Sequence, residues 1–536
     1  MAIPSAVLAA GWIPFVVVIV LTFLFSVAYV RYYMSKYDSE VSSTIAAILA
    51  LTVTLLTSAL VPVDIFLVSY MKTSDGGFKE WANNSATRTS LEESVLYGYF
   101  TLYAIITFCL FLLLPFMYFF YEEKDENSTC KSRCCSSLKY MIVFVIIVAA
   151  LLLIGAFVPT RVVPNANQTE WKNIELLFKD LASNGGEDSL SFVISCLSLL
   201  GMLALVTYTA YGMSALPIGL IKGHKGAKEE MLVVQSKREE NESRRQALKE
   251  KYSRRKRLSG RNEQQFSDID ENNHLMERQE RLLQKKERSC LQKCLLVLRP
   301  FEMLFGFLFL LIALLIFISL LLTNIDKAMH SLGYKLGYAL PRRHLPNPID
   351  IVLVLCQQVF PLDYILMVGV IAYFIFCSMS GIRNIGVWFL WIRMYKIRPR
   401  HTRPQGLLML CMIMMFIVLA INIVVYELTP QYSSFGSQVY IANYTDPTSN
   451  TTSHKTEPCS TEVKDSCVIT RMALLLTRFF YKMWFFGAAY YWLTWVFLGI
   501  YLFGFVVAVV KRKRSAIDGE VDEDDFDESD EDLIRA

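Results

Sequence analysis

The chain has 536 residues, of which 54% are hydrophobic, 13% aromatic and 19% charged, and its formal net charge is +4. So apolar a composition excludes an ordinary soluble protein and is typical of a multi-span membrane protein. The basic clusters at 254–257 and 511–514 lack the interleaved aromatic residues of a nucleic-acid interface, so we expect contact with anionic lipid and no nucleic-acid partner.

Nine apolar runs are long enough to cross a bilayer, which takes about 20 residues at ~1.5 Å each. They are 1–30, 41–71, 94–121, 140–160, 189–221, 303–325, 351–382, 404–426 and 483–510. The first run has no Lys or Arg ahead of it and is followed by Arg31, which predicts an uncleaved span and not a signal peptide. The short run 384–392 is expected to lie at the membrane interface. The sequence therefore predicts an all-α polytopic membrane protein with nine transmembrane helices.

The connections between these spans form two alternating sets with unequal positive charge. The set that contains segment 222–302 and the C-terminal tail holds 38 of the 53 Lys and Arg residues, and the other set holds 15. Without the long segments 222–302 and 427–482 the ratio is 17 to 10, in the same direction. Because positive loops face the cytosol, the pattern predicts a luminal or extracellular N-terminus and a cytosolic C-terminus.

The predicted spans divide the chain into four parts. These are a membrane region at 1–221, a charged cytosolic loop at 222–302, a second membrane region at 303–510 and a tail at 511–536. The second membrane region includes a large luminal loop at 427–482, which carries glycosylation sequons.

The charged loop and the tail differ from the rest in composition. In the loop, sparse leucines among Glu, Lys, Arg and Gln predict two helices, 226–256 and 275–293. The tail is basic and then strongly acidic, which predicts a disordered cytosolic segment. Ser529, followed by three acidic residues, is a phosphorylation candidate.

Glycosylation sequons give an independent check of orientation. Four N-x-S/T triplets fall in the set of connections predicted to be luminal, at Asn83, Asn167, Asn443 and Asn450. Two further triplets, at Asn127 and Asn241, fall on the cytosolic side and should stay unmodified. We therefore expect glycans at the first four positions only.

The cysteines fall into two kinds. Cys459 and Cys467 lie in the large luminal loop, where an oxidising compartment permits a disulfide, with two free thiols as the alternative. The juxtamembrane cytosolic cysteines are palmitoylation candidates, namely Cys130, Cys134, Cys135, Cys290 and Cys294. A zinc site would be an alternative, but no histidine accompanies either group, so we predict no metal site there and keep unmodified thiols as the simplest alternative.

Two aspartates follow prolines inside apolar runs. "VPVD" has Asp64 after Pro62, and "FPLD" has Asp363 after Pro361. An ionised Asp at mid-bilayer costs about 2.5–3.5 kcal/mol, so each must face protein or a water-filled cavity. Each proline is expected to open a local helix break on the luminal side. Matching breaks in two inverted spans are typical of inverted-repeat transporters, whereas the alternative is that both aspartates cap helix ends at the headgroup level.

No chemistry of an enzyme is apparent in the sequence. The chain lacks a G-x-x-x-x-G-K-[ST] loop, so it has no P-loop of its own for driving transport, and it lacks a Ser/His/Asp or Cys/His constellation. All six histidines fall outside the predicted spans, which excludes a bis-histidine haem within the bilayer. We expect neither catalysis nor a permanently bound cofactor.

Several long stretches closely resemble one membrane protein family. They are "TIAAILALTVTLLTSALVPVDIFLVSYMK", "TYTAYGMSALPIGLIKG", "VFPLDYILM" and "SMSGIRNIGVWFLWIR" with "TRPQ". These motifs resemble the limb-region/lipocalin-receptor family, and the resemblance runs over essentially the whole chain. It is weakest in the segment 224–293 and in the acidic tail.

The resemblance implies a lysosomal membrane protein needed to move cobalamin (vitamin B12) from lysosome to cytosol. It implies escort of a half-size subfamily D ABC transporter from the endoplasmic reticulum, and a lasting complex with that transporter and a cytosolic cobalamin-processing protein. It also implies a plasma-membrane role in clathrin-dependent insulin receptor internalisation, which would involve a clathrin adaptor. Two alternatives stay open: a stand-alone secondary transporter, and a lipocalin-type endocytic ligand receptor that would use the 427–482 loop.

Overall fold

The computed structural model describes all residues except 1–4, 36–39, 74, 125–128, 158–184, 224, 254–259, 289, 335–336, 339, 341–342, 358, 360, 390–391, 446–451, 460–466, 483, 512, 514 and 516–536. The described residues are mainly helical, and the chain divides into two compact units. The first unit is Met1–Ser214 with Leu311–Phe505, and the second is Ala215–Leu310 with Val506–Ala536.

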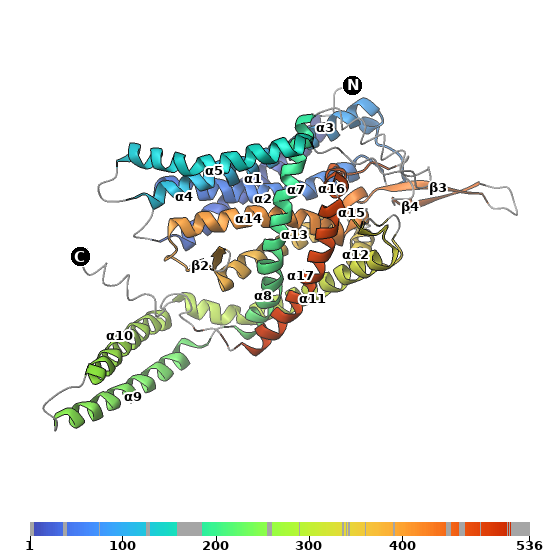
Figure 1. Cartoon of the computed structure of the whole chain (residues 1–536). Helices are drawn as coiled ribbons and strands as arrows, with labels where there is room; N and C mark the ends of the chain where they lie inside the picture. The colour runs from blue at the N-terminus through green and yellow to red at the C-terminus, as the bar shows by residue number, and fades with distance from the viewer. Residues whose placement is uncertain are drawn as a thin grey trace. The chain divides into compact units, whose positions relative to one another are not determined.

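Among the described residues, nine helical segments are long and apolar enough to cross a membrane, so the predicted nine-span helical architecture is confirmed (Figure 1). Seven of the spans are formed by one helix each. These helices are α1 (Ser5–Tyr33), α2 (Val41–Tyr70), α5 (Cys130–Phe157), α11 (Cys290–His330), α13 (Leu362–Ile385), α14 (Pro404–Leu428) and α17 (Trp484–Val510).

The third and fifth spans are composite helices with one π-helical turn each. α3 (Ser85–Phe108) continues through η2 (Cys109–Leu113) into α4 (Leu114–Glu122). α7 (Gly185–Ala204) continues through η3 (Leu205–Thr209) into α8 (Ala210–Lys222). In the third span Pro115 follows the turn and has no N–H for the α-helical ladder, which favours a local change of hydrogen-bond pattern there.

Shorter elements connect the spans. They are the 3-10 helix η1 (Glu80–Ala82), the helices α12 (Pro348–Cys356), α15 (Pro430–Phe435) and α16 (Arg471–Lys482), and the strands β1 (Val387–Phe389), β2 (Ile392–Tyr395), β3 (Val439–Thr445) and β4 (Thr452–Pro458). β1 pairs antiparallel with β2, and β3 pairs antiparallel with β4. The run expected at the membrane interface thus ends α13 and forms the β1–β2 hairpin.

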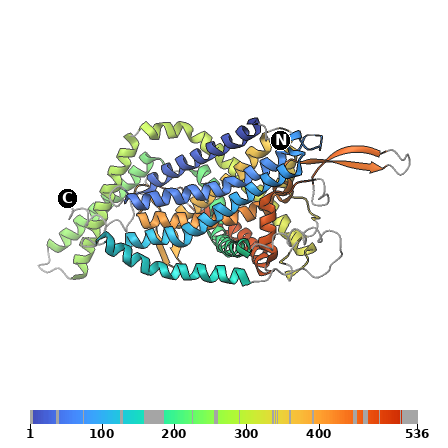
Figure 2. The ribbon, with the colours of Figure 1, turned by 90° about the horizontal axis from the view of Figure 1, so that it is seen from above.

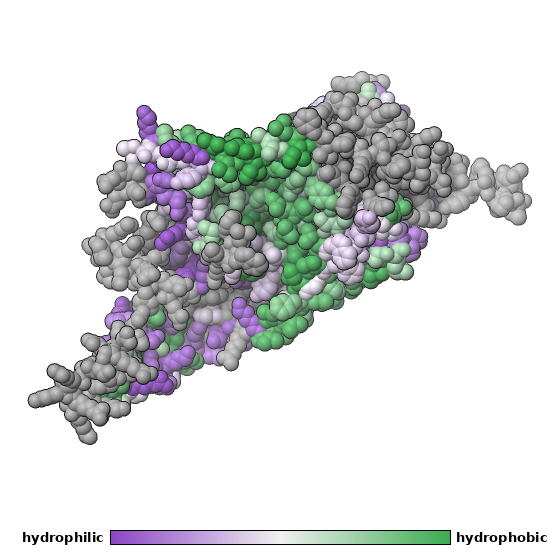
Figure 3. Space-filling model, viewed as in Figure 1, coloured by the Kyte–Doolittle hydropathy of each residue, from purple (hydrophilic) through white to green (hydrophobic). Residues whose placement is uncertain are grey.

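Helix α14 is the centre of the first unit. Of its apolar window 83% is buried, against 11% of the window of α5, and α14 packs against α2 and α7. α2, the α3–η2–α4 span and α5 run side by side in the view from above (Figure 2). In Figure 3, hydrophobic side chains cover most of α5, and hydrophilic side chains lie at its N-terminal end. This distribution is expected of a lipid-facing helix.

One helix crossing in this unit depends on two glycines. A Cβ added to Gly212 would lie 1.9 Å from the carbonyl oxygen of Cys377, and one added to Gly381 would lie 2.0 Å from that of Tyr208. α13 therefore meets the η3–α8 stretch backbone to backbone. Because lipid is as apolar as the helices, close packing of this kind is what holds spans together.

The second unit contains a helical hairpin of α9 (Ala227–Ser253) and α10 (Gly260–Arg288). Its small core is built around Ala227, Val234 and Leu283. The predicted start of the second helix, at residue 275, is wrong by 15 residues. The stretch 260–274 is polar and helical, and Arg245 of α9 pairs with Asp270 at 2.9 Å, so side-chain pairing to the neighbouring helix supports a segment that lacks apolar periodicity.

Candidate functional site

The short helix α15 lies at the centre of a buried polar cluster. We call residues 429–438, which contain α15, the α15 segment. α15 begins at Pro430, where a missing N–H costs nothing, and ends at Gly436, whose φ is +59°. A Cβ added to Gly436 would lie 2.1 Å from Ser69 Oγ, so the segment approaches α2 closely.

Asp350 of α12 caps the N-terminal end of α15. Its Oδ1 accepts the backbone N–H of Tyr432 at 2.9 Å, and its Oδ2 accepts that of Gln431 at 3.0 Å. These N–H groups belong to the first turn of α15, which has no helical partner for them. Burial raises the pKa of the Asp350 carboxyl, while the two N–H groups oppose that rise.

Asp363 contacts the same short helix through a side chain. Its Oδ2 accepts the hydroxyl of Tyr432 at 2.9 Å, and its Oδ1 is buried with no hydrogen-bond partner among the described residues. Asp363 is the second residue of α13, and exposed Pro361 precedes that helix. The helix break expected at Pro361 is confirmed. The predicted seventh span, 351–382, is two helices, because α12 ends at Cys356 and α13 begins at Leu362.

Asp64 holds a different helix end. Its Oδ2 accepts the backbone N–H of Met472 at 2.8 Å and the hydroxyl of Tyr99 at 3.4 Å. Met472 is the second residue of α16, so the carboxylate lies at the positive end of that helix. The expected break at Pro62 is wrong: α2 is helical throughout, because an intact helix satisfies more backbone groups in apolar surroundings than a broken one.

Further hydrogen bonds join the α15 segment to its neighbours. Thr470, just before α16, donates its hydroxyl to the Ser433 carbonyl at 2.6 Å and its N–H to the Ser434 carbonyl at 2.9 Å. Ser437 donates its N–H to Ser69 Oγ of α2 at 3.0 Å. One segment thus links α2, α12, α13 and α16, and the helices that carry both predicted aspartates contact it.

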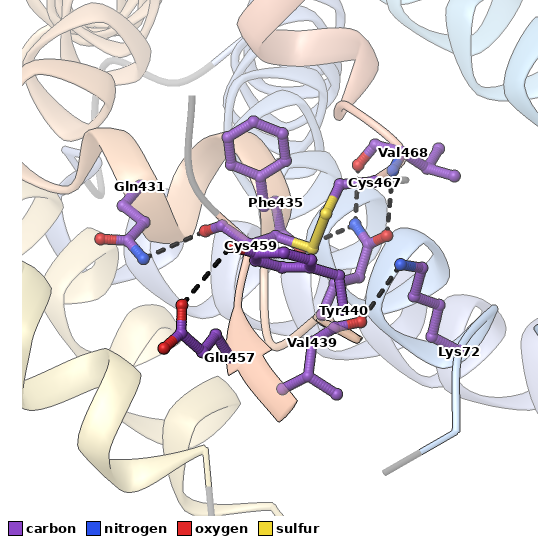
Figure 4. Close-up of a disulfide and its surroundings, with 10 residues drawn as sticks. Lys72, Gln431, Phe435, Val439, Tyr440, Glu457, Cys459, Cys467 and Val468 are labelled. Carbon is purple, nitrogen blue, oxygen red and sulfur yellow. Dashed lines mark hydrogen bonds between the residues drawn. A yellow bond between two sulfur atoms is a disulfide. The ribbon is translucent and has the colours of Figure 1, made fainter. Parts of the chain in front are cut away.

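A disulfide joins Cys459 and Cys467 next to this segment (Figure 4). Phe435 and Tyr440 pack against it. Gln438 of the α15 segment bridges the two sides: its carbonyl accepts the N–H of Cys459 at 2.9 Å, and its side chain bonds the backbone N–H and carbonyl of Val468 at 3.0 and 2.7 Å. The bridge and the amide together hold the connection between β4 and α16.

The predicted modification sites lie in several places. Asn83 is exposed and follows η1, Asn443 is on β3, and Asn241 is half-buried on α9. Cys130 and Cys135 are exposed and Cys134 is half-buried at the start of α5. Cys290 and Cys294 lie on α11, but their side chains are outside the described residues, as are Asn127, Asn167, Asn450 and Ser529 altogether.

Several members of the cluster were not predicted from the sequence, above all Asp350, Tyr432 and Thr470. Two signals were present: "NPID", where Asn347 accepts the N–H of Asp350 at 3.5 Å as an N-cap, and "TPQY", where a proline opens a helix. Carboxylates that accept N–H and O–H donors are suited to fixing helix ends. In the part of the chain described, the cluster pairs no nucleophile with a base.

The family profile described as LMBR1-like membrane protein matches residues 11–296. A probable lysosomal cobalamin transporter of Nematostella vectensis is 48% identical over 100% of both chains. The lysosomal cobalamin transport escort protein LMBD1 of Danio rerio is 47% identical over 100% of both chains, and that of Homo sapiens is 48% identical over 97% of this chain and 96% of its own. No solved structure matches the chain significantly.

Proposed function

Because this chain belongs to the LMBR1-like membrane protein family, we propose that it is a lysosomal membrane escort that supports export of cobalamin to the cytosol. The observation that carries the proposal is the full-length match, at 47% identity over both chains, to a cobalamin transport escort protein. A match of that extent covers all nine spans and both units. An enzyme role has no such support.

An escort acts on a transporter, and the family resemblance suggests which kind. This chain has no P-loop sequence, which agrees with a partner that supplies the ATP hydrolysis. We infer a subfamily D ABC transporter, joined at the lysosome by a cytosolic cobalamin-processing protein, with cobalamin as cargo and not as a bound cofactor. A second role with the insulin receptor and a clathrin adaptor would take the chain to the plasma membrane; it rests on the family resemblance alone.

Two described sequons lie on segments that are joined by hydrogen bonds, which supports the predicted orientation. Asn83 lies in the segment just after α2, where the N–H of Lys79 donates to the carbonyl of Met71. In the same segment, the ammonium of Lys72 donates to the carbonyl of Val439 at 3.1 Å. Val439 begins β3, the strand that carries Asn443. Both sequons therefore belong to one end of the first unit. The hairpin α9–α10 follows the fifth candidate span. Because five crossings separate it from the N-terminus, the proposed orientation puts it on the opposite side of the membrane, in the cytosol.

Glycosidase treatment is expected to shift the mass of the protein only through Asn83, Asn167, Asn443 and Asn450, because only that end would face the lumen. Single Asn→Gln variants, resolved by mass spectrometry of glycopeptides, measure this. Protease added to intact lysosomes should cut 224–293. A glycan at Asn127 or Asn241 would overturn the nine-span orientation.

The α15 segment supports a structural role for the two predicted aspartates. Asp64 accepts the N–H of Met472 at the start of α16, and Asp363 accepts the hydroxyl of Tyr432 in α15. Both partners lie within residues 429–482. We infer that they hold this region in place, so that its outer elements, among them the β3–β4 hairpin, are presented in one conformation (Figure 1). A stand-alone transporter would instead need both carboxylates to line a cavity open to each side in turn.

Cells that lack this protein are expected to retain labelled cobalamin in lysosomes, and reintroducing the chain should restore its release. The measurement is the lysosomal fraction of the label after uptake of the protein-bound vitamin. The matched control is a chain with Gly369→Ala, a position at which an added Cβ would meet nothing within 4 Å, which should restore release fully. Normal release in cells without the protein would contradict a role in cobalamin export of any kind.

A further inference from the structure

Three potential metal ligands meet away from the α15 segment. Asp326 and His330 are one turn apart near the end of α11, and His344 lies in the connection that follows it. One ligand atom from each lies within 4.8 Å of the other two. Asp326 is buried, His330 is half-buried and His344 is exposed, so the group is open on one side.

The three side chains lie close together, and a turn of one imidazole ring would aim both nitrogens at a shared position. The carboxylate Oδ1 of Asp326 lies 2.9 Å from Nδ1 of His330 and 3.9 Å from Nδ1 of His344. The two imidazole rings are stacked, with centroids 4.0 Å apart. The backbone N–H of His344 donates to Oδ2 of Asp326 at 3.1 Å, which fixes the following connection against the helix. Residues four apart share a helix face, as in the paired ligands of other metal sites.

Two described cations near this group contact Glu427. The ammonium of Lys327 lies 2.5 Å from a carboxylate oxygen of Glu427, and the guanidinium of Arg343 donates to the carbonyl of Glu427 at 3.4 Å. Arg343 also interacts electrostatically with Asp326, but among the described residues neither cation donates a hydrogen bond to that carboxylate. The carboxylate therefore faces two imidazoles, a ligand set that suits a divalent transition metal.

We propose that Asp326, His330 and His344 bind a divalent transition metal of the zinc type. Two imidazole nitrogens and one carboxylate oxygen are a ligand set that zinc accepts, with a fourth position left for water. The half-open side of the group provides the entry path. Ligand atoms around a tetrahedral zinc with bonds of ~2.0–2.2 Å lie about 3.4 Å apart. Nδ1 of His330 must therefore move slightly away from the Asp326 carboxylate, and Nδ1 of His344 slightly toward it. The metal then ties the connection after α11 to the helix end.

The simpler alternative is a hydrogen-bonded trio that binds no metal, and a titration separates the two. Full-length protein in detergent, stripped with a chelator, is titrated with Zn²⁺ against a chromophoric competitor at neutral pH, where histidine is a ligand. The expected result is one tight site per chain. Co²⁺ in place of Zn²⁺ should give the visible absorption of a low-coordinate nitrogen–oxygen site.

The variants decide the location. His344→Ala removes an exposed side chain with little risk to folding, and His330→Ala removes a half-buried one; each should weaken binding by more than about 100-fold, since even second-shell losses cost 10–100-fold. His401→Ala, which removes an exposed histidine outside the group, should leave affinity unchanged. Absence of a one-to-one site in the wild-type protein, or an unchanged site in folded His344→Ala, would overturn the proposal.

Discussion

Asp350→Ala is expected to lower the stability of the protein more than any other single change around the α15 segment. The substitution leaves the buried N–H groups of Tyr432 and Gln431 without an acceptor. Each unsatisfied buried donor costs about 1–3 kcal/mol, so the loss is about 2–6 kcal/mol. A folded domain is stable by only about 5–15 kcal/mol. A large fraction of the variant molecules should therefore fail quality control and stay in the endoplasmic reticulum.

The measurement is the melting temperature of the detergent-purified protein, together with the location of a tagged chain in cells. Asp350→Asn is the matched control, because its amide oxygen still accepts one N–H, and its loss should be smaller. Asp64→Asn should also be tolerated, since an amide oxygen can accept the N–H of Met472. An unchanged melting temperature for Asp350→Ala would mean that the α15 segment is held by other contacts.

Gly381→Ala is expected to disrupt the crossing of α13 with the η3–α8 stretch. The added methyl group would lie 2.0 Å from the backbone oxygen of Tyr208, which cannot move aside as a side chain can. The helices must separate, and close backbone packing is lost along the whole crossing. Overpacking typically costs about 1–3 kcal/mol of folding stability and occasionally more. We expect the cost here to be at the upper end of that range or above it, because backbone must shift.

Gly369→Ala on the same helix is the control for this effect. No atom lies within 4 Å of a Cβ added there, so the methyl group meets open space. Alanine is a better helix former than glycine by about 1 kcal/mol, and this gain applies to both variants. Gly369→Ala should therefore be neutral or stabilising while Gly381→Ala is destabilising, as measured by thermal unfolding in detergent. Equal effects of the two substitutions would contradict close packing at this crossing.

The spans could be predicted from the sequence because the bilayer imposes a length and a polarity that no other part of a protein needs. Their interruptions could be predicted only in part: the break at Pro361 was expected, and the unbroken course of α2 through Pro62 was not. Pro62 and Pro361 stand in similar motifs, yet α2 continues through the first and the chain breaks before the second. The aspartate after each proline finds its partner in a distant segment, Met472 for Asp64 and Tyr432 for Asp363, which no local pattern reveals.

The polar cluster was predicted only in part for the same reason. A carboxylate in an apolar run signals that a partner exists, so Asp64 and Asp363 stood out. Asp350 did not, because it follows "LPNP" at the edge of an apolar run, where an aspartate needs no partner. The donors that bind it are backbone N–H groups of a helix that is only six residues long, and so short a helix leaves no periodicity in the sequence.

The location of the subfamily D ABC transporter in cells lacking this protein tests the escort role most directly. Its tagged form should remain in the endoplasmic reticulum, and should move to lysosomes when the wild-type chain, but not a folding-defective Asp350→Ala chain, is restored. Loss of the escort and loss of the transporter should then trap cobalamin to the same extent. If the transporter reaches lysosomes normally while cobalamin stays trapped, the escort role is contradicted, and direct transport by this chain is the better explanation.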